Sequence, residues 1–150
     1  MPTSFVSSKK DSPITEEQIK EIKSRFGNLH YRSVIGALLH VSCCTRPDIT
    51  YAVNKLAKFS HNPGIIIIHY RALIHLIDFI KTTSYKGLKY YSDYTNSSAY
   101  KLLTSNNIKT TEESIITFSD SSGNDCVDTG RSIGGYISFS QGGPNDYGSH

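Results

Sequence analysis

The hydrophobic pattern divides the chain into a helical first part and a β-patterned second part. From residue 31 to residue 81, apolar side chains recur at spacings of three and four, which is the period of an amphipathic helix. Beyond residue 84, apolar and polar positions alternate, which is the period of a half-buried strand. The pattern predicts an α+β protein, in which a small helical bundle is followed by an antiparallel sheet.

Capping and breaking residues set the expected bounds of the helices. Thr15 and Gln18 fit a capping box, which predicts a short charged helix that ends near Phe26. Pro47 and Asp48 suit the first turn of a later helix, where a missing N–H costs nothing and a carboxylate meets the positive end of the helix dipole. The longer helices are predicted over residues 31–44, about 48–60 and about 66–81.

The strands are expected between polar and glycine-rich segments. Residues 104–111 are polar and fit a long hairpin loop, and 121–132 form a second loop rich in Asp, Gly and Ser. The glycines at 142 and 143 are interpreted as turn residues in β structure. The strands themselves are predicted over residues 87–91, 100–103, 114–119 and 133–140.

The net charge of +3 is divided unequally along the 150 residues. Residues 1–91 carry 13 Lys and Arg against 6 Asp and Glu, a net charge of +7, whereas residues 92–150 carry 3 against 7, a net charge of −4. The basic part could contact a polyanion and the acidic part could hold a cation, although two ordinary solvated surfaces would give the same counts.

The cysteines and the longest apolar run indicate an intracellular protein without a membrane partner. Three cysteines, with Cys43 and Cys44 adjacent, do not form a disulfide framework or a zinc motif, and these two are expected to be small core residues. No signal peptide is visible, so the chain is not expected to be secreted, and cytoplasm and nucleus are not distinguished. The isoleucine run at 65–68 is far too short to span a bilayer.

Asp120 is the candidate metal ligand and catalytic residue. It follows a predicted strand, and a carboxylate held at a strand end is well placed to bind a hard cation. The alternative is that Asp120 begins an Asx-turn. A calcium loop over the same residues is excluded, because Asp125 stands where Gly is required and Arg131 where the bidentate Glu belongs. The order Asp-x-Ser also resembles the magnesium site of integrin-like inserted domains, which stays an outside alternative.

The basic helical part contains candidate nucleic-acid contacts. Lys and Arg residues lie on or between the predicted helices and alternate with tyrosines, a pattern that fits contacts to a phosphate backbone. A solvated face, with Lys stems covering the core, is the alternative. The candidate nucleic-acid-binding residues are Arg32, Arg46, Lys55, Lys58, Arg71 and Lys86.

An ordered set of short motifs resembles the Pol polyprotein of copia-type retrotransposons. The resemblance extends over about residues 14–150, and the order of the motifs is more specific than any one of them. The first group resembles the thumb and connection of the reverse transcriptase, and the second resembles the start of the ribonuclease H domain. The motifs are Tyr-Arg-Ser-Val-Ile-Gly-Ala-Leu-Leu at 31–39, Thr-Arg-Pro-Asp-Ile at 45–49, Asn-Pro at 62–63 and Lys-Gly-Leu-Lys-Tyr at 86–90, then Phe-Ser-Asp-Ser-Ser at 118–122, Asp-Thr-Gly-Arg-Ser at 128–132 and Gly-Gly-Tyr at 134–136.

The resemblance implies three segments and a role for Asp120. Residues 1–13 would be a flexible tether, 14–84 a thumb- or connection-like helical segment, and 85–150 the N-terminal β part of a truncated ribonuclease H-like domain with an incomplete sheet. Asp120 would correspond to the first carboxylate of a site that binds two Mg²⁺ ions and cleaves the RNA strand of a hybrid. Such Mg²⁺ is implied for the parent enzyme, and this chain is not expected to bind it tightly.

The resemblance also implies what the chain lacks. The family often has a second Asp and a Trp after the first Asp, where this chain has Ser122 and Gly123. No Asp-Asp pair of a polymerase site occurs, and the remaining ribonuclease H carboxylates would lie downstream. The chain alone is therefore expected neither to polymerise nor to cleave. Its expected partners are an RNA–DNA hybrid or template–primer duplex and the rest of the polyprotein; the alternative is a stand-alone, non-catalytic binding or interaction domain derived from such an element.

Overall fold

The helices of the first part form where the sequence predicts them. The computed structural model describes residues 15–27, 29–63, 68–111, 113–123, 126 and 128–149, and the predicted tether lies outside these residues. Short connections separate the helices, as expected for a small bundle. The elements are α1 (Glu16–Phe26), α2 (Tyr31–Cys44), the 3₁₀ turn η2 (Pro47–Ile49), α3 (Thr50–Ala57) and α4 (Ile68–Thr82).

The apolar stripes of α2, α3 and α4 meet in one hydrophobic core. Tyr31 packs edge-on against Tyr70, with ring centroids 5.2 Å apart, and its hydroxyl donates a hydrogen bond of 3.0 Å to the Leu56 carbonyl oxygen. Burial raises the pKa of the Tyr31 hydroxyl. The most deeply buried core residues are Ile35, Ile49, Val53, Leu56, Leu73 and Leu76.

The expectation that Cys43 and Cys44 are core residues is wrong. Both thiols are exposed. The buried positions of α2 include Leu38 and Ser42, and the next positions of that stripe would be 45 and 46, so residues 43 and 44 point away from it.

Two of the predicted strands do not form. Residues 87–91 run extended but join no sheet, and residues 100–103 lie inside helix α5 (Ser98–Ser105). A helix forms here instead of a strand because the Ser97 hydroxyl caps it, accepting a hydrogen bond of 3.1 Å from the Tyr100 N–H. Ala99 and Leu103 are also buried one helical turn apart. A 3₁₀ turn, η3 (Tyr94–Asn96), precedes it.

The other two predicted strands form a sheet together with a third strand that was not predicted. In the described residues the order is β1 (Ile115–Ser122), β2 (Ile133–Ser140) and β3 (Gly143–Ser149), and both pairs are antiparallel. The α+β expectation is confirmed. A two-residue turn joins β2 to β3: Gln141 and Gly142 have φ of 49° and 76°, as a type I′ hairpin turn requires.

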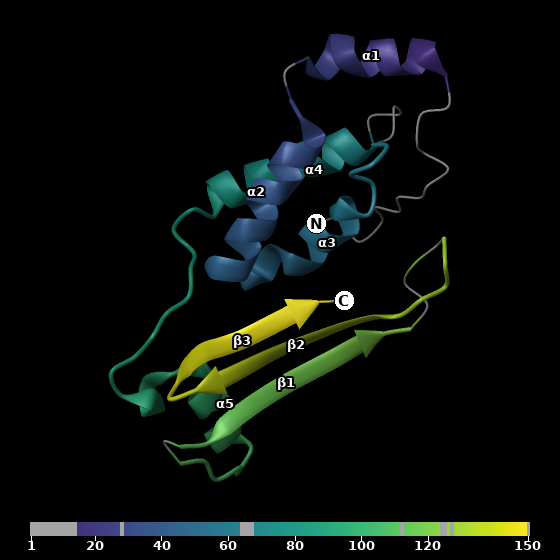
Figure 1. The fold of residues 1–150 in the computed structure, drawn as a ribbon. Coiled ribbons are helices and arrows are strands. Elements are labelled where there is room, and N and C mark those ends of the chain that lie inside the picture. The colour runs from purple at the N-terminus through teal and green to yellow at the C-terminus, as the bar shows by residue number, and fades with distance from the viewer. Residues whose placement is uncertain are drawn as a thin grey trace.

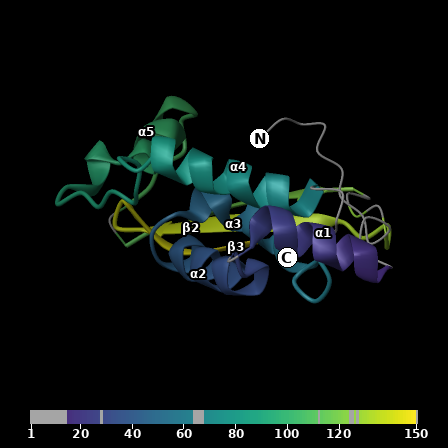
Figure 2. The same cartoon turned by 90° about the horizontal axis from the view of Figure 1, so that it is seen from above.

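Helices α2, α3 and α4 lie on the β3 side of the sheet, whereas β1 forms the outer edge (Figure 1). Two hydrogen bonds to backbone carbonyl oxygens join the helices to β3, and a third joins the segment after α4 to β3. The Asn54 amide donates to Ser149 (2.7 Å), the Tyr147 hydroxyl donates to Cys43 (2.6 Å), and the Tyr90 hydroxyl donates to Pro144 (3.1 Å). Seen from above, α2 and α4 flank α3 over the strands, and α5 lies at the far end (Figure 2).

Two glycine substitutions are expected to change stability in opposite directions. A Cβ at Gly36, exposed in α2, meets nothing within 4 Å, so Gly36→Ala should stabilise the protein by about 0.5–1 kcal/mol.

A Cβ at Gly142 would lie 2.7 Å from the Tyr94 Cα, and the φ of Gly142 is positive. Gly142→Ala should therefore destabilise the protein by at least about 1 kcal/mol. Urea unfolding followed by circular dichroism measures both; a neutral Gly142→Ala would contradict the hairpin geometry.

Candidate functional site

Asp120 lies within β1 and not after it. The strand continues to Ser122, so the predicted strand end at residue 119 is wrong, and no Asx-turn begins at Asp120. The carboxylate is exposed, and its Oδ1 accepts a hydrogen bond of 2.8 Å from the Ser121 N–H. Opposite it stands Gly135, which has no side chain. A hollow of about 400 Å³ is lined by Ser119, Asp120, Ser121, Gly134, Gly135 and Tyr136.

The described residues do not supply the further ligands of a two-metal site. No group of three His, Cys, Asp or Glu side chains among them could hold a metal ion. Asp120 pairs with Gly135 and Asp146 pairs with Ser138, three residues further along β2, so the two carboxylates lie on opposite faces of the sheet. Asp146 instead accepts a hydrogen bond of 3.0 Å from the Tyr136 hydroxyl. The donor set around Asp120 thus does not fit two Mg²⁺ ions.

Arg46, a predicted nucleic-acid contact, is turned into the protein. Its Nε and Nη2 atoms donate hydrogen bonds of 2.8 Å to the two oxygens of Asp48. Nη1 and Nη2 also donate to the carbonyl oxygen (3.1 Å) and hydroxyl (2.8 Å) of Thr83, and the guanidinium lies 5.8 Å from the centre of the Phe79 ring. Only 6% of the side chain is exposed. This arrangement, here named the Arg46 clamp, joins η2 to the end of α4.

The clamp lowers the pKa of Asp48. The largest cause is the hydrogen bonding from Arg46, and the charge of Lys86 adds a smaller contribution. Lys86 therefore stands close to the clamp, on the exposed segment that follows α4.

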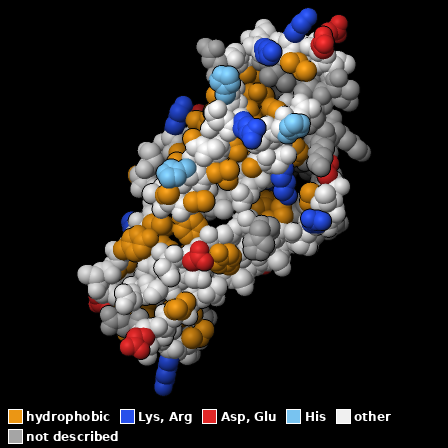
Figure 3. Space-filling model, in the orientation of Figure 1, with side chains coloured by type: hydrophobic (Ala, Val, Ile, Leu, Met, Phe, Trp, Pro, Cys, Tyr) orange, Lys and Arg blue, Asp and Glu red, His pale blue; other side chains and the backbone are white. Residues whose placement is uncertain are grey.

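The other predicted basic residues remain at the surface of the helical part. Arg32, Lys58 and Arg71 are exposed, on α2, at the end of α3 and on α4. Lys55 is half-buried: its Nζ lies 5.4 Å from the centre of the Tyr51 ring and 3.2 Å from that hydroxyl. Figure 3 shows Lys and Arg side chains spread over the helical part, among His and hydrophobic groups. The structure gathers them on one half of the molecule but not into one dense cluster.

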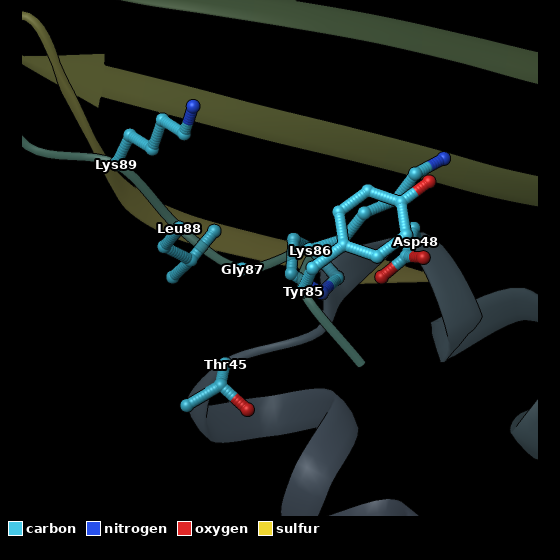
Figure 4. A pocket seen from close by; sticks show the side chains of 8 residues that line it. Thr45, Asp48, Tyr85, Lys86, Gly87, Leu88 and Lys89 are labelled. Carbon is cyan, nitrogen blue, oxygen red and sulfur yellow. The ribbon is translucent and has the colours of Figure 1, made fainter. Parts of the chain in front are cut away.

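A hollow beside the clamp was missed by the sequence patterns. Its volume is about 370 Å³, and one wall comes from Thr45 and η2, while the other comes from the segment after α4 (Figure 4). Predicting residues 87–91 as a strand hid this site, although the interleaved Tyr and Lys residues at 85–91 were a signal. The lining residues are Thr45, Pro47, Asp48, Tyr85, Lys86, Gly87, Leu88 and Lys89.

Comparison with known proteins finds transposon polyproteins among the relatives. The chain is 34% identical over 77 residues to a retrovirus-related Pol polyprotein from transposon TNT 1-94 of Nicotiana tabacum; the match covers 51% of this chain and 5% of the polyprotein. It is 32% identical over 63 residues, 42% of this chain and 43% of the relative, to the secreted RxLR effector protein 161 of Plasmopara viticola. It is also 28% identical over 109 residues to the uncharacterized mitochondrial protein AtMg00810 of Arabidopsis thaliana, covering 73% and 37%.

The similarities support an origin in a retrotransposon Pol polyprotein. The matched segments span less than half the length of each of these relatives. No protein-family profile and no solved structure matches the chain. Among the described residues, no helix is both long and apolar enough to cross a membrane.

Removing the Arg46 guanidinium is expected to destabilise the protein rather than to affect surface binding alone. Arg46→Met leaves the Asp48 carboxylate and the Thr83 carbonyl oxygen without their donor, which should lower the free energy of unfolding by about 1.5–3 kcal/mol at neutral pH. The exposed Arg32→Met is the matched control and should change it by less than about 0.5 kcal/mol. Equal effects of the two substitutions in urea unfolding would contradict the clamp.

The clamp also gives a pH dependence. Because the pKa of Asp48 is lower in the folded state, its contribution is present above the unfolded value of 3.8 and is lost as the pH falls through the folded value. The difference in stability between the wild type and Arg46→Met should therefore persist at pH 5–7 and shrink below about pH 4.

Proposed function

We propose that the chain is a fragment of a copia-type retrotransposon reverse transcriptase and ribonuclease H polyprotein, and that its helical part binds an RNA–DNA hybrid or a template–primer duplex. The observation that carries the proposal is the set of exposed cations on a single packed core: Arg32 and Arg71 project from α2 and α4, Lys58 directly follows α3, and the apolar sides of these helices share that core. Phosphate contacts of this kind position a duplex without reading its sequence. The similarity to a transposon Pol polyprotein supports this choice of polyanion.

The helices make a rigid platform for such contacts. In α4, Arg71 lies on the side opposite the buried Leu73 and Leu76, so its charge points away from the core. Arg32 lies beside the buried stripe of α2, and Lys58 follows the last turn of α3. Cations fixed on packed helices lose less conformational freedom on binding than cations on loops.

Asp120 fits this proposal as one ligand of a metal site that the parent enzyme would complete. We infer no catalytic step for this chain, because Asp120 belongs to no group of three or more potential metal ligands among the described residues. Mg²⁺ is therefore proposed as a cofactor of the parent polyprotein, where further ligands would share the charge of two ions.

A second candidate function is a stand-alone, non-catalytic binding or interaction domain derived from such an element. The self-contained core of α2, α3 and α4 favours it, because this core needs no side chain from the sheet. The two candidates differ in the gene: a reading frame that continues on both sides into polymerase and ribonuclease H sequences supports the fragment, and a start and a stop at these ends supports the domain.

Binding to duplex nucleic acid is expected to be salt-sensitive and to depend on the three exposed cations. For a fluorescent RNA–DNA hybrid, replacing Arg32, Lys58 and Arg71 together by Ala should reduce the slope of log K against log salt by about 2.7, since each phosphate contact contributes about 0.9. Lys101, which is exposed on α5, and Lys109, which is exposed before β1, provide the control double variant. Affinity that does not change with salt, or that falls equally in both variants, would rule the surface out.

The purified chain is expected to show no cleavage of the hybrid in Mg²⁺. A 5′-labelled RNA strand annealed to DNA should remain intact on a denaturing gel, because one carboxylate cannot hold two cations against their mutual repulsion. Asp120→Asn should give the same trace as the wild type. Turnover by the wild type that Asp120→Asn abolishes would show that the chain completes the site after all.

A further inference from the structure

The segment that joins α4 to η3 exposes aromatic and basic side chains together. Residues 85–91 read Tyr-Lys-Gly-Leu-Lys-Tyr-Tyr, and they run over the surface without joining a helix or a strand. The side chains of Tyr85 and Tyr90 are 80% and 69% exposed. Tyr90 is held in place, since its hydroxyl bonds to the Pro144 carbonyl oxygen. Tyr85 projects into solvent at the edge of the 370 Å³ hollow.

The hollow has an aromatic group and a cation at one end and a second cation at the other. Figure 4 shows the Tyr85 ring, Lys86 and the Asp48 carboxylate together, with Lys89 beyond Leu88. Lys86 and Lys89 are three residues apart, so their Cα atoms can lie up to about 10 Å from each other. That is up to about three nucleotide steps of a stacked strand, at about 3.4 Å per step, so the two lysines can contact different phosphates of one strand.

The charge of the hollow is positive. The only carboxylate in its lining is Asp48, and Arg46 already neutralises it with two hydrogen bonds of 2.8 Å. Lys86 and Lys89 form no ion pair with a residue that the structure describes. Two lysine charges are thus available to an anion, and the Tyr85 ring beside them offers a flat apolar face.

We propose that this hollow binds single-stranded nucleic acid, with a base stacked on Tyr85 and two phosphates of the same strand contacted by Lys86 and Lys89. Aromatic rings interleaved with cations are the usual means of holding a strand without reading its sequence. A duplex does not fit the same contacts, because its bases are stacked inside and a ring on a surface segment cannot reach them. The inference rests on the proposed function only in taking nucleic acid as the ligand. It adds a second binding mode: the helices bind paired nucleic acid, and the segment 85–91 binds an unpaired strand.

The test compares a fluorescent single-stranded oligouridine with the RNA–DNA hybrid, using the whole chain and fluorescence anisotropy. Tyr85→Leu should weaken binding of the single strand by about tenfold, whereas Tyr85→Phe, which keeps the ring, should bind within about twofold of the wild type. Replacing Lys86 and Lys89 together by Ala should reduce the salt slope for the single strand by about 1.4, since each contact contributes about 0.7. The control is the Lys101 and Lys109 double variant, which should keep the wild-type slope.

The outcomes separate this inference from the duplex surface. Loss of single-strand binding in Tyr85→Leu, with hybrid binding retained, supports the hollow. Equal affinity of Tyr85→Leu and Tyr85→Phe for the single strand overturns the proposed single-strand site. This holds whether or not the triple variant of Arg32, Lys58 and Arg71 shows weaker binding to the hybrid. Uridine monophosphate that competes at the same concentration as the oligonucleotide would also overturn the proposal, because the hollow would then be a mononucleotide pocket. Thermal unfolding of each variant confirms that the fold is intact, as expected for a side chain that is 80% exposed.

Discussion

One buried guanidinium fixes how the helical part turns and where the chain leaves it. Arg46 binds Asp48 on η2 and Thr83 at the end of α4, so it sets where the chain turns between α2 and α3 and where the connecting segment leaves the bundle. Burying a charge is costly unless its donors are satisfied, and here four hydrogen bonds satisfy them. The hollow beside Tyr85 exists because the clamp brings η2 and this segment together.

The sheet depends on the helices more than the helices depend on the sheet. No side chain of β1 or β2 is fully buried, and the buried core residues of the described chain lie in α2, α3, α4 and α5, in η2 (Ile49) and at Phe59. Hydrogen bonds to carbonyl oxygens at Cys43 and Ser149 join the sheet to the helices, and one at Pro144 joins it to the segment after α4. These bonds fix the position of β3, whereas the hydrophobic core lies within the helical part.

The periodic elements were predictable and the locally determined ones were not. Residues 31–44 and 133–140 form as expected, because each carries a full apolar period on one element. The short segment 100–103 offers too few residues to separate two periods, and the Ser97 cap decides it as a helix. The strand β3 has little apolar pattern; the positive φ of Gln141 and Gly142, which returns the chain beside β2, specifies it.

For the candidate site, the sequence predicts which part of the chain is basic but not which basic side chains are exposed. Counting charges correctly places the basic residues in the first 91 positions, but it cannot tell Arg46, which is enclosed, from Arg71, which is exposed. Enclosure follows from partners far along the chain, since Thr83 is 37 residues from Arg46. A pattern confined to neighbouring residues contains no record of that contact.

The spatial separation of charge has a consequence for how a nucleic acid would lie. Residues 1–91 carry a net charge of +7, and residues 92–150, which include the sheet, carry −4. A polyanion is attracted to the first and repelled by the second within about one Debye length, about 8 Å at physiological salt. It would therefore follow the helices and the connecting segment rather than cross β1, which leaves the Asp120 side of the sheet free of phosphate unless cations are bound there.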